Sequence, residues 1–195
     1  RIPTEVCQLF EPIGIHVHIF YTNLSFSSEA LQGQEPVVVL KGPERLLQRL
    51  GIQTMENELL KQHGPDGVAV ERHRGEHIKL ADVLDAMRTP SLLAPHTLVI
   101  IEGAEHLIKE EDDDGDPITP RGKKARTPRQ VLEDGLASPF PNATLILQAN
   151  DWRPGRIDRV ILDQGGAMVD CKPPSENEIP GWIDRLAADH NRSIA

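Results

Sequence analysis

The chain is poor in cysteine and in aromatic residues, and it has no long apolar run. Its 195 residues include two cysteines, Cys7 and Cys171, which are too few and too far apart for a disulfide framework or a tetrahedral zinc site. Four Phe, two Trp and one Tyr within 38% apolar residues indicate a soluble protein with an aliphatic core. No window approaches the roughly 18 consecutive apolar residues of a membrane helix, and the start lacks the basic and then apolar order of a secretory signal. We therefore expect a cytoplasmic protein without membrane contact.

Positive charge is also scarce. The formal net charge is -9 at pH 7, which argues against a protein that grips nucleic acid over its whole surface. A local basic patch at residues 121–129 could touch phosphates or form a solvated loop, and the sequence leaves both readings open.

Short apolar runs rich in Val and Ile recur along the chain, each ended by Gly, Pro, Asn or a charged residue. Their length and composition are typical of strands buried on both faces, the pattern of a parallel sheet. Segments with apolar residues at helical spacing lie between them, and this alternation predicts an α/β fold with a five-stranded parallel sheet and flanking helices. The predicted strands are residues 36–42, 67–73, 97–103, 143–150 and 167–174, and the predicted helices are 44–62, 80–87, 129–137 and 156–164.

The rest of the chain divides by composition. Residues 1–35 form an extension that we leave unassigned, and 36–172 form the α/β domain. An acidic block followed by a basic block, at about 109–130, predicts a flexible insertion. Residues 173–195 open a helical unit, where Ser175 and Glu178 form a candidate capping box. The apolar stripe of that helix is Trp182, Ile183 and Leu186.

The third strand ends in acid at Glu102 and Glu105, as in nucleotide-hydrolysing proteins, but the matching phosphate-binding loop is missing. Such a loop needs a second glycine, a lysine and a hydroxyl after the first strand. Here "LKGPERLLQRL" follows Gly42 with Pro43, which has no backbone donor. The sequence therefore predicts a degenerate nucleotide site, with Gly42, Glu102 and, at the end of the fourth strand, Asn150 at its positions.

Metal binding and catalysis have little support. "HRGEH", residues 73–77, matches a zinc-peptidase pattern, but that pattern works only on a helix, and Gly75 together with the preceding strand favours a loop. We expect no metal, no cofactor and no catalytic residue.

The connection "MRTPSLLAPHT", residues 87–97, carries Leu92 and Leu93 side by side between Pro90 and Pro95. Neighbouring leucines on a proline-framed loop cannot both point inward easily. They are either an exposed apolar anchor for a partner or ordinary core residues.

Four pieces in order resemble the delta subunit of the bacterial clamp loader, a component of the DNA polymerase III holoenzyme. They are "VVVLKGPERLL", "MRTPSLLAPHTLVIIEGAEHL", "ATLILQANDWRPGRIDRVI" and "VDCKPPSENEIPGWIDRLA", and the resemblance covers roughly residues 36–195. It implies an AAA+-like fold that does not use ATP, followed by a small helical lid domain that would begin at residue 173.

The resemblance also implies a role in DNA replication, without catalysis, in binding and opening the sliding clamp. Its expected partners are the clamp, the other clamp-loader subunits and, through the assembled complex, DNA. The clamp-binding stretch falls on Ser91, Leu92 and Leu93, with Leu93 where the family usually has Phe. Two alternatives remain: a divergent P-loop or AAA+ ATPase with an atypical phosphate site, and an interaction scaffold unrelated to replication.

Overall fold

The computed structural model describes residues 31–92, 94–108, 127–138 and 140–189. Five strands form one sheet in the order β2-β3-β4-β1-β5, and every neighbouring pair is parallel. The predicted five-stranded parallel sheet is thus confirmed. The strands are β1 (Val37–Lys41), β2 (Val68–Arg74), β3 (His96–Glu102), β4 (Ala143–Ala149) and β5 (Ala167–Asp170).

The central strands are buried on both faces, as their continuous apolar runs predict. Side chains of a strand alternate between the two faces of the sheet, so Val37 and Val39 of β1 join one buried cluster, and Val38 and Leu40 join the other. Each face therefore needs a helical cover.

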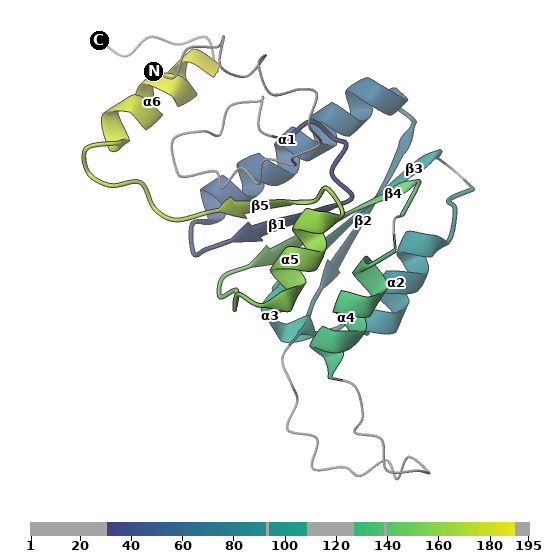
Figure 1. Cartoon of the computed structure of the whole chain (residues 1–195). Helices are drawn as coiled ribbons and strands as arrows, with labels where there is room; N and C mark the ends of the chain where they lie inside the picture. Colours follow the sequence, from purple (N-terminus) through teal and green to yellow (C-terminus); the bar gives the residue numbers. More distant parts are fainter. Residues whose placement is uncertain (1–30, 93, 109–126, 139, 190–195) are drawn as a thin grey trace, which may run out of the picture.

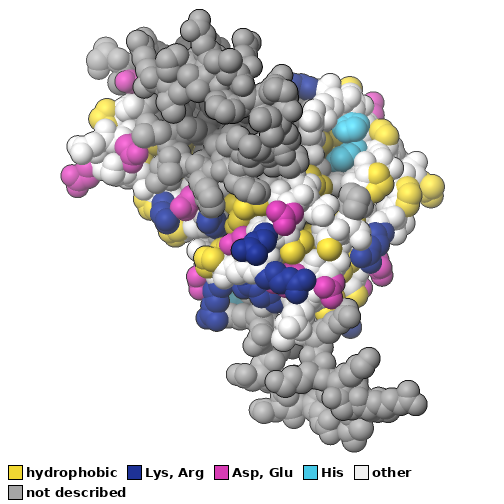
Figure 2. Space-filling view, in the orientation of Figure 1, with side chains coloured by type: hydrophobic (Ala, Val, Ile, Leu, Met, Phe, Trp, Pro, Cys, Tyr) yellow, Lys and Arg dark blue, Asp and Glu magenta, His cyan; other side chains and the backbone are white. Residues whose placement is uncertain are grey.

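Helix α1 (Arg45–His63) covers one face, while α2 (Leu80–Arg88), α4 (Pro128–Leu136) and α5 (Arg156–Asp163) cover the other (Figure 1). Gly51, which weakens the middle of the predicted first helix, is buried within an uninterrupted α1. On the opposite face, acidic and basic side chains mix over α4 and α5 (Figure 2).

Two features of the helical layer differ from the sequence prediction. The short helix α3 (Ala104–Leu107) follows β3 directly, and a helix of one turn leaves no periodic signal in the sequence. The predicted insertion also ends too late, because residues 127–130 form the capped start of α4. Thr127 Oγ1 accepts from the Gln130 backbone N–H at 3.3 Å, and the Gln130 side chain accepts from the Thr127 N–H at 3.2 Å. Residues 109–126 of that insertion lie outside the described part of the chain.

Helix α6 (Ile179–Asp189) follows β5 and begins after the predicted Ser175–Glu178 pair. Glu178 accepts hydrogen bonds from the Ser175 backbone N–H at 2.8 Å and from its hydroxyl at 2.7 Å. Trp182 is buried in the cluster that α1 covers, whereas Ile183 is 45% exposed. These two residues of the predicted apolar stripe therefore differ in burial, and the side chain of Leu186 lies outside the described residues. Leu31 joins the same buried cluster, so the core takes in a residue from the segment before position 36.

Histidine side chains gather where α1 ends and β3 begins (Figure 2). The rings of His63 and His96 stack with their centroids 4.6 Å apart, and His96 Nε2 lies 3.0 Å from Thr144 Oγ1. Burial, with His63 as a second cause, lowers the pKa of His96 to about 4. His96 is therefore neutral at physiological pH.

Among the described helices, none has the length and apolar character to cross a bilayer.

Candidate functional site

The three residues assigned to the degenerate nucleotide site lie at one edge of the sheet. Gly42, Glu102 and Asn150 follow or end β1, β3 and β4, and parallel strands place their carboxyl ends at a common edge. Strand register sets Glu102 opposite Gln148 and Lys41 opposite Ala149. The structure therefore brings the three positions together, and their assignment to a nucleotide site stays a prediction.

In open parallel sheets, ligands bind in the crevice between neighbouring strands whose following helices leave toward opposite faces. Here that pair is β1 and β4, because α1 covers one face and α5 covers the other. A nucleotide would have to enter between Gly42 and Ala149.

The protein backbone closes this crevice. The Gly42 N–H donates to the Ala149 carbonyl at 2.9 Å, and the Glu44 N–H donates to the Cys171 carbonyl at 3.0 Å. Pro43, between them, has no N–H. None of the three residues after β1 has a free backbone donor for a phosphate.

Gly42 has a φ of 131°, and a Cβ atom there would collide with the Cys171 carbonyl oxygen. Only glycine can pass so close to the end of β5. This glycine is therefore required for packing against β5, whereas the glycines of a phosphate loop make room for a ligand.

Gln48 of α1 completes the closure of the crevice between β1 and β4. The sequence did not predict this role of Gln48. Its side chain is 0% exposed, and its Nε2 donates to the carbonyls of Gly42 at 2.7 Å and Ala149 at 3.2 Å. Its Oε1 accepts from Gln148 Nε2 at 2.6 Å. The only signal was a glutamine beside Leu47 on a helix face that is otherwise apolar.

A carboxylate already stands at the start of α1. Glu44 is the N-cap residue, and its Oε1 accepts from the Leu46 N–H at 3.2 Å. Helix N-termini bind phosphate through free N–H groups and a positive end. The Glu44 carboxylate occupies one of these N–H groups, that of Leu46, and adds negative charge.

Burial, followed by the nearby Asp170 and Glu44, raises the pKa of the Cys171 thiol to about 12. This thiol stays protonated and is a poor nucleophile.

The acidic residues at the end of β3 differ in their partners. Glu105 accepts from the Asn150 N–H and from Asn150 Nδ2, both at 3.3 Å. Asn150 is thus occupied with holding α3 to the end of β4. Glu102 is exposed, and its carboxylate has no hydrogen-bond or ion-pair partner among the described residues.

The clamp-binding candidates lie at the other edge of the sheet, about 20 Å away along the seven residues of β3. Leu92 is 102% exposed. The neighbouring Ser91 Oγ accepts from the Ala94 N–H at 3.3 Å, and Ala94 is buried. This hydrogen bond fixes the loop beside Leu92. Leu93 lies outside the described residues.

The zinc-peptidase pattern is not on a helix. His73 belongs to β2, and residues 75–77 form a turn. Within the part of the chain that the structure describes, no group of three or more His, Cys, Asp or Glu side chains could hold a metal ion.

A five-stranded parallel sheet with helices on both faces is the α/β fold that the sequence predicted. A search of solved structures returns the DNA clamp loader delta protein of Bacillus subtilis, with a TM-score of 0.58 and 18% sequence identity. The match covers 82% of this chain and 45% of that protein. The fold is therefore the one expected from the resemblance, and this chain spans less than half the length of that protein.

A chain of the Escherichia coli HORMA:CdnC:Trip13 complex is a weaker neighbour, at a TM-score of 0.46 and 10% identity over 80% of this chain and 55% of that one. No protein-family model matches the sequence, and no curated protein matches it either.

Proposed function

We propose that this chain is a non-catalytic clamp-loader subunit of the delta type, which binds the sliding clamp through the loop of residues 87–97. The observation that carries the proposal is the full exposure of Leu92 on a loop framed by Pro90 and Pro95. A large apolar side chain that is exposed to solvent is a typical anchor for a pocket on a partner. The other clamp-loader subunits and, through them, DNA are its further proposed partners.

The closed crevice supports the non-catalytic part of the proposal. The N–H groups of Gly42 and Glu44 are bonded inside the protein, and the Glu44 carboxylate stands at the start of α1. A triphosphate would have to break these bonds and face a like charge. We therefore expect a calorimetric titration with magnesium and ATP to give no heat of binding, and measurable binding would favour the divergent ATPase instead.

The two edges of the sheet would then have separate tasks. The closed edge fixes α1 to β4 and β5, and the opposite edge presents Leu92 on the loop before β3. If the pocket that receives Leu92 is better formed in an opened clamp, binding shifts the ring toward that state by its differential affinity.

The test is the affinity for the sliding clamp of the source organism, measured by surface plasmon resonance. Burial of a leucine contributes about 1.5 to 3 kcal/mol, so Leu92→Ala should weaken the Kd by roughly 10- to 150-fold. Leu46→Ala is the matched control, because Leu46 is 47% exposed at the opposite edge, and it should leave the Kd unchanged. Equal affinities for wild type and Leu92→Ala would remove the proposed role of the loop.

A further inference from the structure

The loop that carries Leu92 is joined to β3 by a stiff link. The Ser91 Oγ accepts from the Ala94 N–H at 3.3 Å, so Leu92 lies inside a short turn that this hydrogen bond closes. Ala94, at the end of the turn, is buried. Pro95 follows, and a proline fixes its own φ and restricts the residue before it. The orientation of the turn therefore depends on the next residue, His96, with which β3 begins.

The His96 side chain is held by contacts from three parts of the chain. Its backbone N–H donates to the Gly67 carbonyl, just before β2, at 3.2 Å. Its Nε2 lies 3.0 Å from Thr144 Oγ1 of β4. Its ring stacks on that of His63, with 4.6 Å between the centroids and 18° between the planes. His96 is thus a fixed point at the end of the loop.

His63 is the contact that can be changed without disturbing the core. It is the last residue of α1, and it is exposed, whereas His96 is 9% exposed. Stacked ring pairs add stabilisation beyond the area that they bury. Because substitutions at exposed positions usually change global stability little, loss of this ring should act locally, on His96 and on the loop before it.

We propose that His63 is a positioning residue for docking: by stacking on His96 it holds the end of the 87–97 loop and keeps Leu92 in the orientation that a partner pocket receives. The proposal rests on the proposed docking role of Leu92. A loop that is ordered before binding loses less conformational entropy when it binds. The stack therefore raises affinity without a contact between His63 and the partner.

Hydrogen exchange of the free chain, followed by NMR, tests the order of the loop without any partner. His63→Ala should speed exchange of the Ala94 amide at least about threefold, because the turn opens more often. His63→Phe keeps a ring at this position and should restore the wild-type rate. The urea midpoint of both variants should equal that of wild type, since the side chain is exposed.

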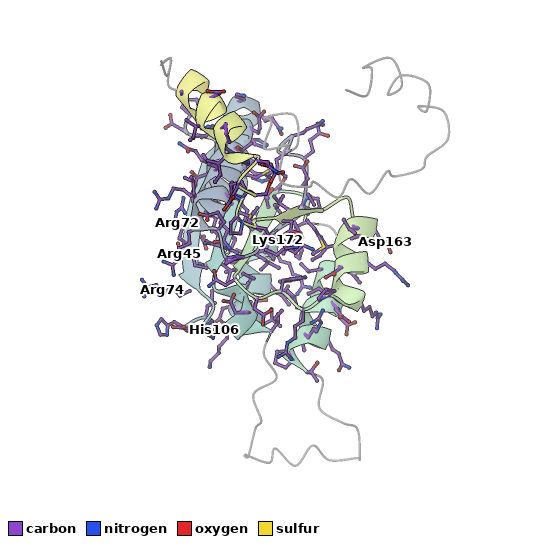
Figure 3. The ribbon with its side chains drawn as sticks, turned by 90° about the vertical axis from the view of Figure 1, so that its left-hand side faces the viewer. Arg45, Arg72, Arg74, His106, Asp163 and Lys172 are labelled. Atoms are coloured by element: carbon purple, nitrogen blue, oxygen red, sulfur yellow. The ribbon has the colours of Figure 1, made fainter. Side chains whose placement is uncertain are left out.

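Surface plasmon resonance on the immobilised sliding clamp tests the effect on docking. His63→Ala should weaken the Kd roughly 2- to 10-fold, the range expected for one stacked ring pair, and His63→Phe should bind like wild type. His106→Ala is the matched control, because His106 is also an exposed histidine. It lies near Arg74, the last residue of β2, at the other edge of the sheet (Figure 3). This control should change neither the exchange rate nor the Kd.

The outcomes separate the positioning role from the docking role. An unchanged exchange rate of Ala94 in His63→Ala would overturn the proposal, whether or not the chain binds a clamp. A weaker Kd at an unchanged exchange rate would mean that His63 contacts the partner directly, and would also overturn it. Leu92→Ala tests the docking role by itself. If Leu92→Ala binds like wild type, the docking role fails, and the proposal fails with it even where His63→Ala speeds exchange.

Discussion

Replacing Gln48 tests whether the edge between β1 and β4 is a structural joint. Gln48→Met keeps the length of the side chain and removes hydrogen bonds to the Gly42 carbonyl, to the Ala149 carbonyl and from Gln148. The Ala149 carbonyl still accepts from the Gly42 N–H. The Gly42 carbonyl and Gln148 Nε2 lose their partner. At about 0.5 to 1.5 kcal/mol for each bond, and more for a buried group left unpaired, the free energy of unfolding should fall by about 2 to 4 kcal/mol.

The assay is urea unfolding followed by circular dichroism, with the change taken from the midpoint at constant slope. Gln53→Met is the matched control, because Gln53 is an exposed glutamine of the same helix, and it should change stability by less than about 0.5 kcal/mol. Gln148→Met alone should cost about 1 kcal/mol. The double variant should cost less than the sum of the two single changes, because both remove one shared bond. A Gln48→Met variant as stable as wild type would refute the reasoning.

Three further predictions concern stability. Gly42→Ala should lower the free energy of unfolding by about 1 to 3 kcal/mol or more, measured by urea, because of its positive φ and the Cys171 carbonyl; a neutral result would contradict the turn geometry. Thr127→Ala should cost about 1 kcal/mol in the same assay through loss of the cap of α4, whereas an unchanged midpoint would argue against the cap. The folded-state pKa of His96, about 4, lies below its unfolded value near 6.5. Its contribution is therefore complete above about pH 6.5 and falls by about 1.4 kcal/mol per pH unit as the pH drops toward 4. His96→Asn should reduce that slope in thermal unfolding, and an identical slope would contradict this assignment.

The strands were predictable because the sheet is buried on both faces. Runs such as that of β4 are apolar at successive positions, so their place in the sequence follows from burial alone. The predicted bounds agree with the structure to within a residue for β1 through β4. The fifth run, residues 167–174, was predicted too long, because β5 ends at Asp170. Pro173 and Pro174 follow shortly after it, and proline cannot extend a strand ladder.

The degenerate site was predictable in part. The missing donors after Gly42 can be counted in the sequence, and the common edge of Gly42, Glu102 and Asn150 follows from parallel strands. What fills the site could not be predicted. Gln48 bonds to Gln148, which is 100 positions away, and a local pattern carries no information about such a partner. The same holds for the polar cleft between α1 and the carboxyl ends of β2, β3 and β4, where Arg45 and Arg74 come from different elements.

We propose a docking protein whose nucleotide crevice is closed. The most direct test is surface plasmon resonance of this chain on the immobilised sliding clamp of its source organism, with and without magnesium and ATP. We expect binding with the same Kd in both buffers. Binding that requires ATP, or no binding in either buffer, would contradict it.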